Sequence, residues 1–434
     1  MFKKRLIVIL LACTLAVITI VPICAGAAEK NVQIRFSWWG NELRHQATLE
    51  VINLYMKKNP HVKIEAEYRG KSDQAKIATQ LASGTIADVV QLNPPWMVDM
   101  TANGDFFVDY KTKKKLIDLS GFDQDFLKSY GVYNGKLIGL PTGVNARATM
   151  INETVAKEFN IPTGLNVKWT WDDLYNIGKT VNQKNSNKYF LNSDSRTLGT
   201  FVLRPYIKQK TGKQFIKDDY TLGFTRDQLV DALNYIAKLY QGKVLQPAAE
   251  ANVFLDVTST NPKWINGDLV AEFMWTSQFE GASRDTKGTM GAFIMPMNPK
   301  SKDTGMIVQP SQLIAVSKKS KHIDESVKFV DFFFNDIEAG KILRDVRSIP
   351  PVAKVRNACS EAGLLNKLVV EGVDYGLKYP GIADNGPSTN VEIEKIITDA
   401  IEKIGYGVSA DKVGDETIKL LNNQLRSLKN NRSK

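Results

Sequence analysis

The chain has 434 residues and a formal net charge of +11, with its lysines and arginines scattered among acids. Its length exceeds what one hydrophobic core usually organises, so we expect two lobes. The charge pattern argues against nucleic-acid binding, because no basic block with interleaved aromatics occurs outside the short tail over residues 426–434. Cys359 is the one cysteine beyond the predicted export signal, which excludes a disulfide within the mature chain and indicates a small core residue.

Residues 1–28 are predicted to be an export signal. Three cations at residues 3–5 precede an apolar run over residues 6–23, and a small-residue stretch follows at residues 25–28. This order is typical of a cleaved signal peptide, so we expect the mature protein in the periplasm or at the outer face of the cytoplasmic membrane. Two alternatives stay open: an uncleaved anchor, because the apolar run approaches membrane-spanning length, and a lipid anchor on a cysteine of the signal.

The segment that follows alternates between predicted strands and helices. Strands are expected over residues 32–42, 62–68 and 86–92, and helices over residues 43–58 and 72–84. Val32, Ile34 and Phe36 alternate with polar residues, as in a strand that buries one face. Strands separated by helices of this length predict an α/β fold with a mostly parallel sheet and right-handed crossovers.

Turn and capping signals divide the remaining chain. Pro141 and Gly143 interrupt a strand pattern, and Thr170 is placed to cap the helix that follows it. We interpret residues 183–195 as a polar linker and expect a helix over residues 226–240.

An ordered series of short motifs identifies a family resemblance. The motifs include FSWWGNE, LASGTIADVV, NGKLIGLPTGVNARATMINE, NGDLVAEFMW, IMPMNP and RSIPPV, and the series covers nearly all of residues 32–352. In this order they resemble the extracellular solute-binding proteins of bacterial ABC importers, in the sugar-binding group that includes maltose-binding protein. Each motif alone is weak, but the series is specific.

The resemblance implies a two-lobed Venus-flytrap fold with about three crossings between the lobes. The crossings would lie near residues 141–143, near residues 309–312 and after residue 351. The implied domains are a signal peptide at residues 1–28, lobe one at residues 29–141 and 309–355, and lobe two at residues 142–308 and 356–434.

The resemblance also implies a function. The protein would be a monomer that captures a monosaccharide or oligosaccharide in a cleft between the lobes and delivers it to the transmembrane subunits of an ABC permease. Closure of the hinge would trap the sugar, because contacts from both lobes exist only in the closed form. No cofactor and no metal is expected.

The residue types at the predicted strand ends suit a carbohydrate. A sugar ring offers an apolar C–H face to aromatic rings and a rim of hydroxyls to planar polar side chains. The first group of candidates is Trp38, Trp39, Asn41 and Glu42, and the second is Asn93 and Trp96, where Trp96 is expected on a rigid loop after two prolines. Adjacent strand residues face opposite sides, so at most one of the first two tryptophans is expected to stack on a ligand.

Lobe two contributes two further groups. Asn145 and Arg147 share one face of an extended run, and the resemblance implies that Asn145 hydrogen-bonds a sugar. Trp275 and Gln278 follow a predicted strand, although relatives carry their stacking tryptophan two residues later.

Three of these candidates have a second, structural interpretation. Asn41 and Glu42 could cap the helix that follows them, and Arg147 could form a structural salt bridge.

Arg347 and Tyr375 are weaker candidates for the same site. Arg347 lies near a predicted crossing, and Tyr375 precedes a Gly-rich and Asn-rich stretch. The basic excess, together with Arg147 and Arg347, suggests acidic sugars such as uronides.

Two alternatives to the importer function stay open. Glycoside hydrolysis requires only two carboxylates across an aromatic-lined cleft, and Glu42 with Glu272 is such a pair. A sugar receptor for a signalling partner would use the same cleft. Other enzyme classes are disfavoured, because the chain has three histidines and none of the common catalytic or nucleotide-binding motifs.

Overall fold

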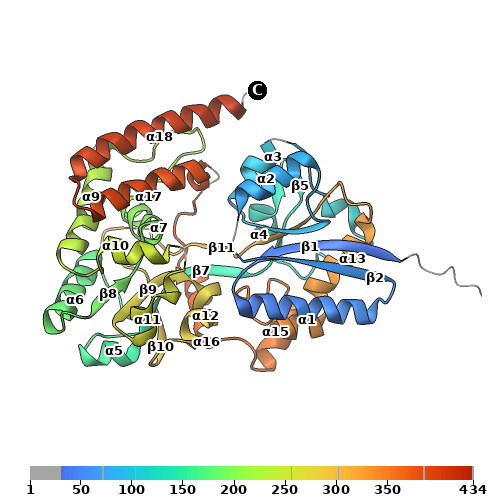
Figure 1. The fold of residues 1–434 in the computed structure, drawn as a ribbon, viewed down its shortest axis with the longest axis horizontal. Helices are drawn as coiled ribbons and strands as arrows, with labels where there is room; N and C mark the ends of the chain where they lie inside the picture. The colour runs from blue at the N-terminus through green and yellow to red at the C-terminus, as the bar shows by residue number, and fades with distance from the viewer. Residues whose placement is uncertain are drawn as a thin grey trace, which may run out of the picture.

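The computed structural model describes residues 31–70, 73–102, 104–255, 257–301, 303–384 and 387–432. The predicted export signal lies outside these residues. Two sheets dominate the fold, one of order β2-β1-β3-β12-β6 and one of order β10-β7-β9-β8, with β11 paired to β7. We call the parts built on them lobe one and lobe two, and they lie on opposite sides of the view in Figure 1.

Lobe one contains the parallel strands that the sequence predicts. Its strands are β1 (Val32–Trp39), β2 (Val62–Arg69), β3 (Val89–Leu92), β6 (Leu140–Pro141) and β12 (Leu313–Val316). β1 pairs in parallel with β2 and with β3, whereas β12 is antiparallel to β3 and β6. The predicted mostly parallel sheet is therefore confirmed for this lobe.

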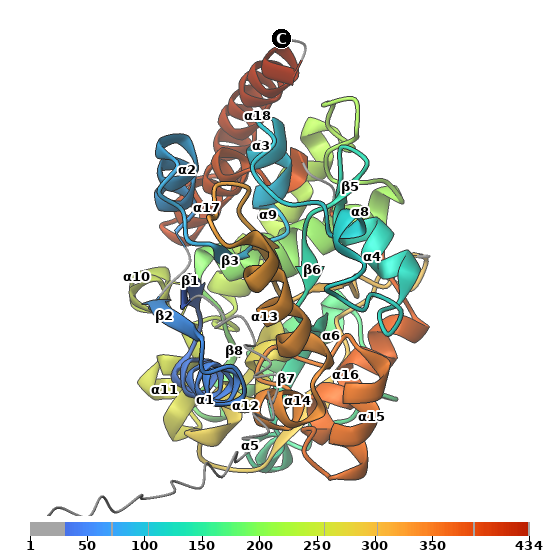
Figure 2. The ribbon, with the colours of Figure 1, turned by 90° about the vertical axis from the view of Figure 1, so that its right-hand side faces the viewer.

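Helices cover both faces of this sheet. They are α1 (Glu42–Lys58), α2 (Gln74–Ser83), α3 (Trp96–Ala102), α4 (Gln124–Tyr130), α13 (Ile323–Asn335), α14 (Ile337–Leu343) and α15 (Ala353–Glu361). Figure 2 views lobe one from its outer end, with α1 and α13 in the foreground. Gly84 ends α2 in the left-handed conformation, as its sequence position predicts. A short 3-10 turn (Tyr110–Lys113) and the β4–β5 pair (Val132–Tyr133, Lys136–Leu137) complete the lobe.

Lobe two is built around the long central strand β7. Its strands are β7 (Val144–Asn152), β8 (Tyr189–Asn192), β9 (Leu269–Trp275), β10 (Met290–Phe293) and β11 (Val308–Pro310). The predicted linker over residues 183–195 was wrong in part, because it contains β8. Phe190 and Leu191 of this strand are fully buried, and four residues are too few to show a clear alternation.

The helices of lobe two pack around its sheet and extend to the C-terminus. They are α5 (Glu153–Glu158), α6 (Trp171–Lys184), α7 (Ser195–Leu198), α8 (Arg204–Thr211), α9 (Arg226–Gln241), α10 (Ala248–Ala251), α11 (Pro262–Asn266), α12 (Phe279–Arg284), α16 (Lys367–Lys378), α17 (Val391–Gly405) and α18 (Ala410–Arg432). Thr170 caps α6 in a reciprocal capping box with Asp173, as predicted. α17 and α18 lie beside α9 (Figure 1).

Three chain segments run side by side where the lobes meet. The Thr142 amide donates to the Gln312 carbonyl at 2.9 Å, and the Val144 amide donates to the Ile349 carbonyl at 2.8 Å. A side chain at residue 143 would collide with the Arg347 carbonyl, so glycine is required there for close approach. The crossings at residues 142–144 and 310–312, together with the adjoining segment 347–349, therefore form one hydrogen-bonded hinge.

The third crossing between the lobes lies near α15 and α16. α15 packs on lobe one, since Val355 and Cys359 belong to the core that contains Ile34 and Phe36. The chain then enters α16, whose Val369 and Val373 pack with β7 and β9 residues of lobe two. The division at residues 355 and 356 stays a prediction, and this packing favours a boundary after α15.

Candidate functional site

Both sheets direct strand ends toward the boundary between the lobes. β1 runs from the outer end of lobe one toward the hinge (Figure 1), and its parallel neighbours β2 and β3 end on the same side. In lobe two, β9 is antiparallel to β7, so its last residue Trp275 pairs with Arg147 near the start of β7, beside the hinge. The carboxyl ends of strands are where α/β folds usually place ligands.

The adjacent tryptophans Trp38 and Trp39 occupy opposite faces of lobe one, as their strand position predicts. Trp38 has no exposed surface and packs against Phe36 at 5.1 Å and against His45 at 5.7 Å between ring centroids. It therefore belongs to the core and offers no face to a ligand. This result assigns Trp38 the packing role and leaves Trp39 as the candidate.

Trp39 belongs to a stacked cluster at the strand ends. Its ring lies 5.1 Å from that of Trp96 at an interplanar angle of 30°, and the Arg69 guanidinium lies over its ring at 5.3 Å. Trp39 and Trp96 are each only 7% exposed, so a ligand can meet only their rims. The predicted loop position of Trp96 was wrong: it is the first residue of α3, and the prolines precede the helix instead of holding the ring out on a loop.

Arg69 ends β2 beside this cluster and was missed by the sequence reasoning. Its Nη2 donates to the Gln91 carbonyl at 3.3 Å, while its Nε and Nη1 are buried without an acceptor. Burial lowers the pKa of Arg69, and Asp73 and Glu67 oppose that effect at longer range. The strand end thus carries a cation with two available donors.

Arg347 is a second cation near Arg69, on the side-chain side of Gln91. Its Nη2 donates to Thr48 Oγ1 at 2.8 Å and, at 3.4 Å, to Gln91 Oε1, and its Nη1 is buried without an acceptor. Arg44 lies nearby and donates to the Val346 carbonyl at 3.0 Å. Burial lowers the pKa of Arg44 to about 10, and burial and then Arg44 lower the pKa of Arg347 well below its ordinary value. These acceptors are neutral, so they do not balance the two charges.

The polar candidates of lobe one lie around the start of α1 and the end of β3. Asn41 caps α1, because its Oδ1 accepts from the Arg44 amide at 3.0 Å. Its Nδ2 lies 2.8 Å from the position that a Cβ on Gly281 of α12 would occupy, so it faces lobe two closely. Glu42 is exposed and accepts from Gln46, and the Asn93 carbonyl accepts from the Trp96 amide. Asn41 therefore has the helix-capping role that the sequence left open.

Asn145 is fixed within lobe two. It is 4% exposed, and its Oδ1 accepts from the Thr276 hydroxyl and from the Ser277 amide, both at 2.9 Å. The Thr276 hydroxyl also bonds to the Ser348 hydroxyl at 3.0 Å. Asn145 thus connects β7 to the turn after β9 and to the hinge.

Arg147 belongs to a buried ion cluster. Its Nη2 donates to Asp384 Oδ2 at 2.7 Å, Lys208 Nζ donates to Asp384 Oδ1 at 3.0 Å, and Arg204 Nη1 lies 3.9 Å from Asp384 Oδ2. Burial by itself would raise the pKa of Asp384, but Lys208, Arg147 and Arg204 outweigh it and hold that pKa well below its ordinary value. Arg147 therefore makes the structural salt bridge that was its second interpretation.

Trp275 connects this cluster to the lobe boundary. It is half-buried, and the Arg147 guanidinium lies 5.3 Å from its ring. Gln278 is exposed, and its Oε1 accepts from the Trp275 amide at 3.1 Å. Tyr375 lies elsewhere, in a hollow of about 570 Å³ that it shares with Glu153 and Met290. The structure thus brings Trp275 and Arg147 together, whereas Tyr375 lines a hollow to which neither of them contributes.

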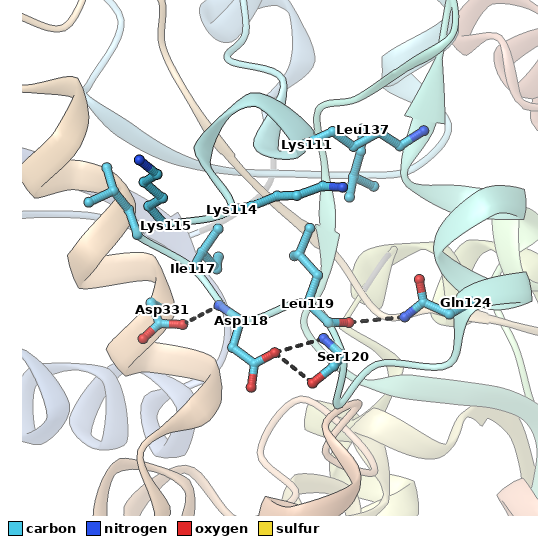
Figure 3. A pocket seen from close by; sticks show the side chains of 11 residues that line it. Lys111, Lys114, Lys115, Ile117, Asp118, Leu119, Ser120, Gln124, Leu137 and Asp331 are labelled. Atoms are coloured by element: carbon cyan, nitrogen blue, oxygen red, sulfur yellow. Dashed lines mark hydrogen bonds between the residues drawn. The ribbon is translucent and has the colours of Figure 1, made fainter.

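A second hollow, of about 930 Å³, lies on lobe one. Figure 3 shows Lys111, Lys114 and Lys115 around it, with Asp118 accepting two hydrogen bonds from Ser120. The full set of lining residues is Lys111, Lys114, Lys115, Leu116, Ile117, Asp118, Leu119, Ser120, Gln124, Leu137 and Asp331. None of the predicted ligand residues lines this hollow, so it is separate from the strand-end site.

The two carboxylates of the hydrolase alternative lie in different lobes. Glu42 is exposed at the start of α1, whereas Glu272 is 1% exposed in β9. Glu272 accepts hydrogen bonds from Asn192 Nδ2 at 2.8 Å and from the Thr258 hydroxyl. Burial raises the pKa of Glu272 to about 8, although Thr258 and Asn192 oppose that effect. The two groups have separate partners and different surroundings.

Comparison with known proteins decides the family. The family model described as bacterial extracellular solute-binding protein matches residues 40–339. The chain belongs to this family. A curated binding protein from Brucella abortus is 21% identical to this solute-binding protein over 280 residues, which are 63% of this chain and 65% of the relative. The match therefore spans less than two thirds of the length of that relative.

Solved structures agree with the two-lobed fold of maltose-binding-protein-like receptors. A periplasmic solute-binding protein from Pectobacterium atrosepticum is 28% identical, with a TM-score of 0.83 over 91% of this chain and 99% of that chain. An oligogalacturonide-binding protein from Yersinia enterocolitica, solved with saturated digalacturonic acid, is 25% identical, with a TM-score of 0.84 over the same shares. The resemblance seen in the sequence motifs is thereby confirmed, as is the predicted α/β two-lobed fold.

Two further observations concern the described residues alone. Within them, no three metal-ligating side chains come together as a metal site. Their helices include none with the length and apolar character needed to cross a membrane.

Proposed function

We propose that this solute-binding protein captures an acidic oligosaccharide between its lobes, outside the cytoplasmic membrane, and delivers it to an ABC permease. Uronic acid units suit the site because each carries both a sugar ring and a carboxylate. The ligand would meet the strand ends of lobe one and the Trp275 region of lobe two, and hinge closure would complete its contacts.

The observation that carries this proposal is the Arg69 guanidinium on the Trp39 ring. Two of its donors are buried without an acceptor at the carboxyl end of β2. Buried donors normally have a partner, and a missing partner costs about 1–3 kcal/mol. A carboxylate supplies two acceptors in the planar geometry that a guanidinium matches. An acidic sugar ring at this strand end would therefore satisfy Arg69 while its apolar face meets the tryptophan rims.

The charge around Arg69 supports the same ligand class. Arg44 and Arg347 are buried with neutral acceptors, and their positive charges repel each other. A neutral sugar would leave this repulsion in place, whereas an anionic sugar would reduce it. The ligand of the Yersinia enterocolitica relative, digalacturonic acid, belongs to the acidic class and agrees with this preference.

Calorimetry with matched sugars tests the proposal. The protein is titrated with digalacturonic acid and with a neutral galactose disaccharide at the same ionic strength. We expect binding of the acid without turnover, and weaker binding of the neutral sugar. Tighter binding of the neutral sugar, or hydrolysis of either sugar, would contradict the proposal.

A pair of arginine variants identifies the group responsible. Arg69→Gln should weaken digalacturonate binding by roughly 10-fold to 100-fold, because charge-assisted hydrogen bonds are lost. Arg35→Gln is the matched control, since Arg35 lies on the same sheet but already donates to Glu67 and to the Thr85 carbonyl. Equal affinity losses in both variants would indicate a general charge effect and not a site at the strand end.

A further inference from the structure

An irregular segment of lobe two places a carboxylate over three buried cations. We call residues 380–384, which follow α16, the strap. Asp384 at its end contacts Arg147 of β7 and both Arg204 and Lys208 of α8. The side chains of the four residues are 0–4% exposed, so the contact is enclosed.

Aromatic rings contact two of the three cations beside Asp384. The Arg147 guanidinium lies between the rings of Phe201 and Trp275, at 5.4 and 5.3 Å from their centroids. The Arg204 guanidinium lies 5.4 Å from the centroid of the Phe215 ring. Aromatic faces attract guanidinium groups, and β7 and α8 fix the backbones. The two guanidinium groups would therefore keep their arrangement if the carboxylate left, whereas Lys208 Nζ donates to Asp384 and to the Ile382 carbonyl and would need new acceptors.

The cluster also has more donors than its acids satisfy. Nε and Nη1 of Arg147 and Nε of Arg204 are buried without an acceptor. Asp303 faces the same cations; its Oδ1 accepts from the Gly305 and Ile382 amides, at 2.9 and 3.1 Å, and its Oδ2 is buried without a hydrogen-bond partner. Three cations thus face two acids, and the excess positive charge favours a further or stronger anion.

The strap is an irregular segment that hydrogen-bonds to other parts of lobe two. The Gly381 amide donates to the Met306 carbonyl at 2.5 Å, the Ile382 amide donates to Asp303, and the Ile382 carbonyl accepts from Lys208 at 2.6 Å. Its residues belong to no helix or strand, and Ala383 is exposed. Local openings are expected to begin in such segments, whereas β7 and α8 should stay folded.

We infer that Arg147, Arg204 and Lys208 form a carboxylate-binding site of lobe two, which Asp384 occupies as an internal carboxylate and yields to the carboxylate of a bound acidic sugar. Trp275 provides the approach, since it is half-buried at the lobe boundary and touches Arg147. The exchange with sugar rests on the proposed function. The existence of the anion site does not, and simple carboxylates can test it separately.

Rescue by formate tests the site without any sugar. Asp384→Ala removes the carboxylate and leaves space beside three cations, so the melting temperature should fall by several degrees. Sodium formate should restore at least half of this loss in a saturable way, because a ligand that binds only the folded state stabilises it. Sodium chloride at equal ionic strength should restore less, and the wild-type protein should respond equally to both salts.

Glu272→Ala is the matched control for rescue. It also removes a buried carboxylate from lobe two, but the groups that contacted it, Asn192 and Thr258, are neutral. Formate should therefore not stabilise it beyond the chloride effect. Formate stabilisation that is equal in the two variants, or absent in Asp384→Ala, would overturn the inference. If Asp384→Ala does not fold even with formate, Asp384→Ser also leaves space for formate and offers the cations a hydroxyl acceptor, and the same comparison decides.

Amide hydrogen exchange of the wild-type protein tests whether a sugar carboxylate displaces Asp384. Digalacturonate should accelerate amide exchange at Gly381 and Ile382, because the strap must leave when a sugar carboxylate enters. If digalacturonate binds with measurable heat but hydrogen exchange at these amides is unchanged or slower, the displacement of Asp384 by the sugar is overturned. The proposed function then stays intact. Absence of binding heat would instead contradict the proposed function, and the formate result would still decide on the anion site.

Discussion

The two lobes treat their buried arginines differently. In lobe one, Arg44 and Arg347 donate to carbonyl, hydroxyl and amide oxygens, so their charge is solvated but not neutralised. In lobe two, Arg147, Arg204 and Lys208 gather around the carboxylate of Asp384. Removal of one partner of a buried ion pair costs about 3–5 kcal/mol, whereas a buried charge without a counter-ion itself lowers stability. The lobe-two cluster should therefore dominate stability, and the lobe-one arginines should dominate the response to an anionic ligand.

Removal of the Asp384 charge should have the largest effect on folding. Asp384→Asn leaves three buried cations with only Asp303 nearby, and we expect the free energy of unfolding to fall by about 3–5 kcal/mol. Urea titration at pH 7 measures the change. A loss below about 1 kcal/mol would mean that the cluster is solvated as well as the lobe-one arginines are, and the contrast between the lobes would disappear.

The pH dependence of stability at Glu272 tests the same contrast between paired and unpaired buried charges. Among the described residues, the side chains that bond to Glu272 are neutral. Its pKa is raised from 4.5 to about 8, so protons bind the folded state more tightly. Its contribution to stability is complete below pH 4.5 and is lost as the pH rises through 8. Between pH 5 and pH 8.5 the loss should be of the order of 2–4 kcal/mol.

Glu272→Gln should remove this slope, since glutamine keeps the shape and cannot ionise. Urea titrations at several pH values compare the variant with the wild-type protein. Parallel curves for the two proteins would show that other groups cause the alkaline loss.

Trp275 tests whether lobe two contributes to ligand affinity at all. Trp275→Leu removes the ring beside Arg147, and cation–π contacts of this kind contribute about 0.5–2 kcal/mol. We expect digalacturonate affinity to fall by roughly 3-fold to 30-fold, as measured by calorimetry. Tyr375→Leu is the control, because Tyr375 lies in a separate hollow. An affinity loss in the control alone would move the site toward α16.

Arg347 should show the smallest effect on stability. Arg347→Met loses the bonds to Thr48 and Gln91, but it removes a buried charge and its repulsion with Arg44. We expect the free energy of unfolding to change by less than about 1.5 kcal/mol, far less than for Asp384→Asn. Comparable losses in the two variants would show that Arg347 is as firmly paired as the lobe-two cations.

The sequence predicts the fold much better than the site. The parallel strands of lobe one follow from local alternation and capping, which short windows of sequence contain. β8 was not predicted, because its four residues show no clear alternation of apolar and polar side chains. The opposite faces of Trp38 and Trp39 follow from strand geometry alone, but which face holds core and which approaches the lobe boundary depends on packing by distant helices.

The missed site residues share a physical reason. Arg69 ends β2, Arg204 and Lys208 lie in α8, and Asp384 follows α16, so the partners are up to 237 residues apart along the chain. A spacing rule cannot detect such a cluster, and an isolated arginine resembles a solvated surface residue. The one signal available was the end position of Arg69 on a predicted strand, next to the strand of the two tryptophans.

The backbone of Arg347 lies in the hinge, whereas its guanidinium lies in lobe one. Its carbonyl accepts from Ser311 within the hinge, and its guanidinium reaches Thr48 and Gln91 below the strand ends of lobe one. If the ligand is anionic, as proposed, its attraction for the guanidinium would act on the hinge through the covalent bonds of this single residue. Charge recognition and hinge closure would then be coupled without intermediate side chains.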